Sequence, residues 1–190
     1  KEKELVIINP YERKIIVVTP KEEKNINQHI ENCRMLGDKL QTELKDEKSV
    51  VIIDLKESQK ETFAIIEGLA LSNYTFTKHK TKEKANQLKK IYLCKKKYNK
   101  QILELQNIID AVSSTKDLVN EPFSHLTAKD LAVQAKKIGK KNGIKTTVLN
   151  KKKIEDLKMG GLLAVNKGSL DEPTFTIMQW KPKNAKNKNP

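Results

Sequence analysis

The chain has 190 residues, of which 37% are hydrophobic and 33% charged, and its formal net charge is +14. This length allows one large or two small domains, and the hydrophobic fraction is low but sufficient for a core. No window holds 18 consecutive apolar residues, which excludes a membrane-spanning helix. The start of the chain, Lys1–Leu5, lacks the long apolar core of a signal peptide.

Lysine supplies nearly all of the positive charge, because Arg13 and Arg34 are the only arginines. Arginine is the residue whose planar guanidinium suits phosphate and guanine recognition, so this make-up argues against a specific nucleic-acid partner. The densest basic stretch, Lys78–Lys100, holds ten lysines but only two aromatic residues, Tyr92 and Tyr98. Two aromatics are too few for a base-stacking platform, and a solvated surface is the favoured interpretation. An acidic or nucleic-acid partner remains the alternative.

The two cysteines, Cys33 and Cys94, are isolated and have no CxxC partner. Two such thiols provide neither a disulfide framework nor zinc-ligand spacing. We expect both to be reduced and buried or half-buried. A reducing cytoplasmic location follows from this expectation.

Strand and helix signals alternate along the first part of the chain. Short β-branched runs predict strands, and apolar residues at helical spacing predict helices. The predicted order is a strand at 14–18, a helix at 22–47, a strand at 50–55, a helix around 63–74, a strand at 90–94 and a helix at 99–119. The 50–55 strand is apolar on successive residues, which predicts cover on both faces. Strands separated by helices indicate a largely parallel α/β sheet.

A second α/β unit is predicted after Pro122, because proline disfavours helix at the residue before it. Thr127 and Asp130 have the spacing of a capping box and open a helix that closes near Asn142-Gly143. The later predictions are a strand at 144–149, a helix at 152–157, a strand at 162–165 and a strand at 174–180. The boundary between the two units is placed within residues 100–120, and the tail 181–190 is predicted to be a surface loop or frayed end.

No residue pattern predicts a catalytic or metal site. The histidines His29, His79 and His125 are scattered, and a solvated or capping role is expected for each. The carboxylates Asp110, Asp117 and Glu121 lie on or near one predicted helix, where surface charge is the common case. The glycines Gly160, Gly161 and Gly168 do not form a phosphate-binding loop; they give permissive backbone at both ends of the predicted strand. Lys167 is assigned to the turn after that strand.

Three segments resemble the leucyl aminopeptidase (cytosol aminopeptidase) family of dinuclear metallopeptidases. They occur in the family's order and together span about residues 60–180. The segments are Glu67–Phe76 with Lys78, Asp117–Pro122 followed by Leu126-Thr127, and Met159–Ser169 followed by Pro173 and a strand that ends at Trp180. Met159–Ser169 is the most informative of them, because it resembles the stretch that leads into the family's metal site.

The resemblance implies an N-terminal macro-domain-like α/β domain, residues 1–110, followed by the linker-helix end and first part of the peptidase catalytic domain, residues 111–190. It implies a parent enzyme that removes N-terminal residues such as leucine from peptides with two divalent metal ions, zinc or manganese. The parent is expected to be a cytoplasmic homohexamer, and membrane and nucleic-acid partners are not expected. The part before about residue 60 has no matching motif and is short for the family.

The family's metal ligands lie in a Gly-Lys-Gly…Asp-x-Gly-Gly segment and an Asn-Thr-Asp-Ala-Glu-Gly-Arg segment, and neither occurs here. No catalytic, metal or substrate-binding residue can therefore be carried onto this chain. The 190 residues are expected to be an inactive N-terminal portion that binds no metal itself. Two alternatives stay open: a non-catalytic α/β binding or assembly module, and a basic nucleic-acid-binding protein.

Overall fold

The computed structural model describes residues 4–11, 13–81, 86–182 and 184–185. It divides into two compact units, residues 1–117 and 118–190. Parts of the predicted basic stretch (82–85) and of the predicted tail (183 and 186–190) lie outside the described residues. No described helix is both long and apolar enough to cross a membrane. The fold is a mixed α/β arrangement, as predicted.

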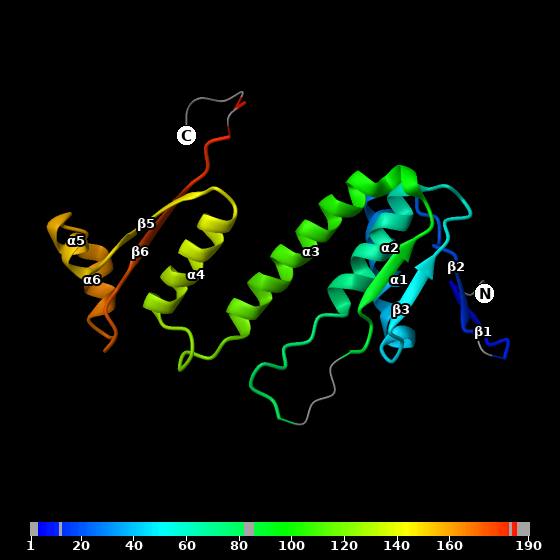
Figure 1. The fold of residues 1–190 in the computed structure, drawn as a ribbon, viewed down its shortest axis with the longest axis horizontal. Helices are drawn as coiled ribbons and strands as arrows, with labels where there is room; N and C mark the ends of the chain where they lie inside the picture. Colours follow the sequence, from blue (N-terminus) through cyan, green and yellow to red (C-terminus); the bar gives the residue numbers. More distant parts are fainter. Residues whose placement is uncertain (1–3, 12, 82–85, 183, 186–190) are drawn as a thin grey trace. The chain divides into compact units, whose positions relative to one another are not determined.

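The first unit combines two helices, two short strand pairs and the larger part of a third helix (Figure 1). Its elements in chain order are β1 (Leu5–Ile8), β2 (Ile15–Val18), α1 (Ile26–Leu44), β3 (Ser49–Ile52), α2 (Gln59–Ser72), β4 (Lys90–Leu93), a 3-10 turn η1 (Lys96–Tyr98) and α3 (Asn99–Asn120), which runs past residue 117. Helix α1 starts where the Asn25 side chain accepts hydrogen bonds from the main-chain N–H groups of Asn27 and Gln28.

The core of the first unit lies between α1, α2 and the strands. Leu40, Leu44, Leu69 and Leu88 form its buried centre, and half-buried residues of β1 to β4 pack against it. The two helices approach closely because Gly37 on α1 and Gly68 on α2 carry no side chain. A Cβ on Gly68 would overlap the main-chain carbonyl oxygen of Arg34.

The second unit is smaller. Its elements are α4 (Ala128–Lys141), β5 (Lys145–Leu149), α5 (Lys151–Asp156), α6 (Gly160–Asn166) and β6 (Phe175–Gln179). The predicted capping box is confirmed: Asp130 N–H donates to Thr127 Oγ1 at 3.4 Å, and Thr127 N–H donates to Asp130 Oδ2 at 3.0 Å. Ile154 on α5 is fully buried in this unit.

The prediction of a largely parallel sheet is wrong for the described residues. They form three two-stranded sheets, of which only β3–β4 is parallel, whereas β1–β2 and β5–β6 are antiparallel. The β1–β2 connection is too short for a parallel crossover, which needs a dozen or more residues. The chain between β5 and β6 contains α5 and α6 and is long enough for a parallel crossover. Strand β6 nevertheless pairs with β5 in the antiparallel direction. Strand β1 itself was not predicted.

The prediction that both faces of the 50–55 strand are covered is also wrong. Strand β3 ends at Ile52, and its alternating burial shows that only one face packs on the core. Val51 is 57% exposed, and Ile53 and Leu55 are more exposed still. A run of β-branched residues favours a strand, but it does not reveal whether a second layer exists to cover the outer face.

The prediction of a strand at 162–165 is the third error. Residues 160–166 form helix α6, in which no residue is buried and Val165 is 85% exposed. Leucine and alanine are good helix formers, and a short apolar run cannot by itself distinguish strand from helix. The turn predicted after this segment is present: Asn166 Nδ2 donates to the Asp171 carbonyl at 2.9 Å, and Ser169 Oγ accepts from Asp171 N–H at 3.1 Å.

Candidate functional site

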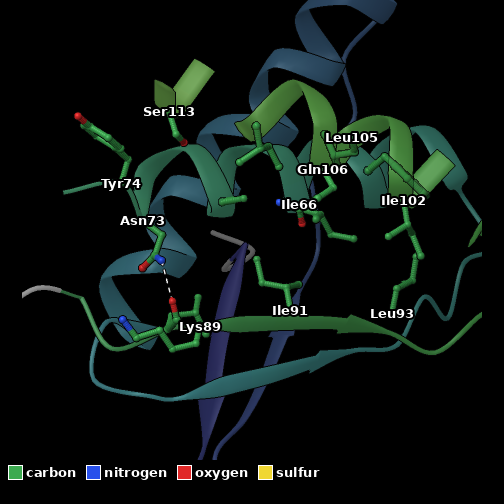
Figure 2. A pocket seen from close by; sticks show the side chains of 14 residues that line it. Ile66, Asn73, Tyr74, Lys89, Ile91, Leu93, Ile102, Leu105, Gln106 and Ser113 are labelled. Carbon is green, nitrogen blue, oxygen red and sulfur yellow. Dashed lines mark hydrogen bonds between the residues drawn. The ribbon is translucent and has the colours of Figure 1, made fainter. Parts of the chain in front are cut away.

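A cavity of about 300 Å³ lies in the first unit between α2, β4 and α3 (Figure 2). Most of its lining is apolar and comes from three elements with regular spacing. Helix α2 contributes Phe63, Ile66 and Ala70; β4 and the segment just before it contribute Leu88, Ile91 and Leu93; helix α3 contributes Ile102, Leu105 and Ile109. The apolar positions of α3 recur at i, i+3 and i+7, so one stripe of that helix faces the cavity.

Most of the polar lining residues gather toward one end of the cavity, whereas Gln106 lies among the apolar residues (Figure 2). Figure 2 shows Asn73, Tyr74, Ser113 and Lys89 at this end, and Leu93 with Ile102 at the other. Asn73 is held in place because its Nδ2 donates to the Leu88 carbonyl at 2.9 Å. Its carbonyl oxygen Oδ1 accepts from Gln41 at 3.4 Å.

Tyr74 is also fixed at the polar end. Its hydroxyl donates to Asp117 Oδ1 at 2.7 Å. The Lys116 ammonium lies 5.1 Å from the centre of the Tyr74 ring, within the range of a cation–π contact. Asp117, which the sequence places among surface carboxylates, is exposed and serves to orient this tyrosine.

The other candidate residues have structural partners of their own. The His29 ring is buried, with Nδ1 3.0 Å from the Lys21 carbonyl and Nε2 3.3 Å from a Glu61 carboxylate oxygen, so it ties α1 to α2. The His79 ring packs against Phe76 at 5.9 Å between centroids. Asp110 is exposed and accepts from Gln106 at 2.7 Å.

Of the two cysteine thiols, that of Cys33 is buried and that of Cys94 is exposed. Cys33 is fully buried, and burial raises the pKa of its thiol above the ordinary value, which keeps it protonated and unreactive. Cys94 is exposed, so the expectation that both are buried or half-buried is wrong for this residue. Both are free, as predicted.

The described residues of the second unit do not by themselves bring three potential metal ligands together. Its Glu121 and His125 ligand atoms come within 4.8 Å of each other, but two ligands are fewer than the three or more that catalytic ions usually take. Lys167 lies at the C-terminal end of α6 and is exposed. No reaction step is therefore assigned to a metal on residues of this unit.

The basic stretch provides a shallow hollow rather than a stacking platform. Lys48, Lys89 and Lys90 line it together with Tyr92, in a space of about 480 Å³. Tyr98, the other aromatic residue of the stretch, is buried against Phe63 in an edge-to-face contact with ring centres 5.7 Å apart. Tyr92 is thus the aromatic side chain that the described part of Lys78–Lys100 leaves exposed.

Sequence reasoning missed the cavity, although its signal was present. The spacing of Ile102, Leu105 and Ile109 predicts an apolar face on α3. Pattern alone cannot show that this face stands away from β4, because the gap depends on the packing distance between the two elements.

Comparison with known proteins finds relatives of this chain, and the C-terminal part matches a family model. Residues 113–190 match the family model described as "Cytosol aminopeptidase family, catalytic domain". A probable cytosol aminopeptidase of Chlorobaculum parvum is 60% identical over 70 residues, which are 37% of this chain and 14% of that protein. One of Clostridium perfringens is 35% identical over 140 residues, which are 70% of this chain and 28% of that protein. The chain thus covers less than a third of these relatives.

Two solved structures share the fold. The bottromycin maturation enzyme BotP in complex with Mn has a TM-score of 0.79 at 16% identity, over 94% of this chain and 39% of that one. A mutant of tomato leucine aminopeptidase has a TM-score of 0.78 at 19% identity, over 93% of this chain and 37% of that one. The sequence matches confirm the predicted resemblance to the cytosol aminopeptidase family, with residues 113–190 matching the model of its catalytic domain, and the two solved structures show the same fold.

Proposed function

We propose that this chain is the N-terminal portion of a metal-dependent aminopeptidase that hydrolyses N-terminal residues from peptides. The match of residues 113–190 to the family's catalytic domain carries this proposal. Residues 1–110 would form a macro-like N-terminal domain, and residues 111–190 the linker-helix end and first part of the catalytic domain. The whole enzyme would act in the cytoplasm as a homohexamer.

The surface of the second unit supports a role as part of a larger domain. Phe175 and Ile177 alternate along β6 on the face opposite the packed one, and both are exposed. Leu157 and Val165 on the neighbouring helical segments are more exposed still. Several exposed apolar side chains in one small unit are typical of a surface that further protein covers.

The proposal assigns the chemistry to groups that these 190 residues lack. Divalent zinc or manganese ions, when bound, supply Lewis-acid polarisation of the peptide carbonyl. The ligand segments expected for two such ions do not occur in the sequence. The chain's own residues would serve as scaffold, and the 190-residue polypeptide alone would be inactive.

Hydrolysis of leucine p-nitroanilide tests both parts of the proposal. Purified residues 1–190, with added Mn²⁺ or Zn²⁺, should release no more nitroaniline than the metal alone. The longer protein that carries these residues should release it, and a chelator should abolish the activity. Metal-dependent turnover by residues 1–190 would overturn the assigned inactivity. A folded longer protein without peptidase activity would overturn the assigned function.

A further inference from the structure

We propose that the first unit binds a small amphiphile with an anionic head in the cavity between α2, β4 and α3. This site is separate from the proposed peptidase chemistry. The ligand class is a medium-length aliphatic carboxylate, whose chain would lie among the isoleucines and leucines and whose carboxylate would lie at the Lys89 end (Figure 2).

The size of the cavity is the first argument. This half-open space of about 300 Å³ falls at the lower end of the volumes of small-ligand sites. At roughly 30 Å³ for each non-hydrogen atom, as in liquid water, it accommodates about ten such atoms. Octanoate has this size.

The incomplete packing of α3 is the second argument. This helix runs for 22 residues, yet none of them is buried. Its apolar stripe, Ile102, Leu105 and Ile109, is half-buried and faces Ile91 and Leu93 across the cavity. An aliphatic chain between these walls would remove apolar surface from water on both sides, which is the main source of affinity in such sites.

The charge of the lining selects the head group. Among the lining residues that the structure describes, Lys89 carries the only charge, and no carboxylate is present. Ser113 adds a hydroxyl group toward the same end, whereas the Tyr74 hydroxyl already donates to Asp117 and the Asn73 amide to the Leu88 carbonyl. A carboxylate placed beside Lys89 would meet a cation, whereas a cationic head would be repelled by the Lys89 ammonium.

Binding of octanoate to the full chain tests the proposal, with 1-octanol as the neutral probe of the same length. Methyl resonances of Ile91, Ile102 and Ile109 should shift saturably with octanoate, and octanoate should bind more tightly than octanol. The Lys89→Gln variant should weaken octanoate binding about three- to fivefold, the range of a partly exposed ion pair, and leave octanol unchanged. Lys90→Gln is the matched control, because this neighbouring lysine does not line the cavity.

A cavity-filling variant tests the location. Ala70→Leu on α2 places added methyl groups in the cavity and should weaken both probes at least tenfold while circular dichroism stays unchanged. The proposal is overturned if octanoate shifts none of these methyl groups up to its solubility limit, or if a folded Ala70→Leu variant binds as tightly as the wild type. Should Ala70→Leu fail to fold, equal effects of Lys89→Gln and Lys90→Gln on octanoate binding would overturn it.

Discussion

The two helices of the first unit pack closely at positions where glycine leaves room for the opposite backbone. Gly37 of α1 lies against the backbone of α2, where an added Cβ would overlap the Ile65 carbonyl oxygen and lie 2.7 Å from the Leu69 main-chain nitrogen. Backbone atoms cannot turn aside as a flexible side chain can. The helices must therefore separate to accept any other residue, and the leucine core behind them would loosen.

Gly37→Ala should accordingly lower the free energy of unfolding by about 1–3 kcal/mol, the usual cost of overpacking a core. Urea denaturation, combined with hydrogen exchange of α1 and α2 peptides, measures this loss. Asp38→Ala is the matched control, since this next residue of the same helix is exposed. A Gly37→Ala protein as stable as the Asp38→Ala protein would show that the helices do not pack this closely.

At the scale of elements, the sequence predicts where helices and strands lie along the chain better than it predicts which strands pair or which of their faces are buried. The helices α1 to α4 and most strands occur near their predicted bounds, because periodicity and end signals such as Pro122 and Thr127 act within a few residues. Strand direction, the bare outer face of β3 and the helical state of 160–166 depend on partners distant in sequence. For the same reason the sequence identified the family through Met159–Ser169 but assigned that segment the wrong conformation.

Helix α4 shows how a local end signal also sets a pH dependence. Hydrogen bonds from the Thr127 hydroxyl and main-chain N–H lower the pKa of the Asp130 carboxyl below its ordinary value of 3.8. A carboxyl whose pKa is lowered on folding contributes stability above its unfolded pKa. That contribution is lost as the pH falls through the folded pKa. The cap should therefore be fully effective at neutral pH and weaken below about pH 4.

Asp130→Asn should remove this part of the acid sensitivity of the second unit. Stability should then depend less on pH between about 2 and 4 than in the wild type, while Thr127→Ala should cost roughly 1 kcal/mol at neutral pH, as for other N-caps. Fluorescence of Trp180, the single tryptophan, monitors unfolding in the same unit. An Asp130→Asn profile that parallels the wild type throughout the acid range would contradict the assigned role.

At the scale of the whole molecule, the two units differ in how much core each contains. The first buries four clustered leucines, with Leu69 fully buried, and half-buried residues of four strands pack against them. In the described part of the second unit, Ile154 is the large side chain that is fully buried. Because buried apolar area supplies most of the stabilising free energy, we expect the second unit to unfold at a lower urea concentration than the first.

Two core truncations test this expectation of separate stabilities. Leu69→Ala should cost about 2–5 kcal/mol in the first unit and shift hydrogen exchange of α1 and α2 without moving the Trp180 transition. Ile154→Ala should do the opposite and move the Trp180 transition alone. If either variant shifts both probes equally, the units unfold as one cooperative body, and interactions beyond the two separate cores must then stabilise the second unit. If the probes shift separately, the smaller core of the second unit limits its stability, because its exposed apolar residues Phe175 and Ile177 contribute little to folding while they stay in contact with water.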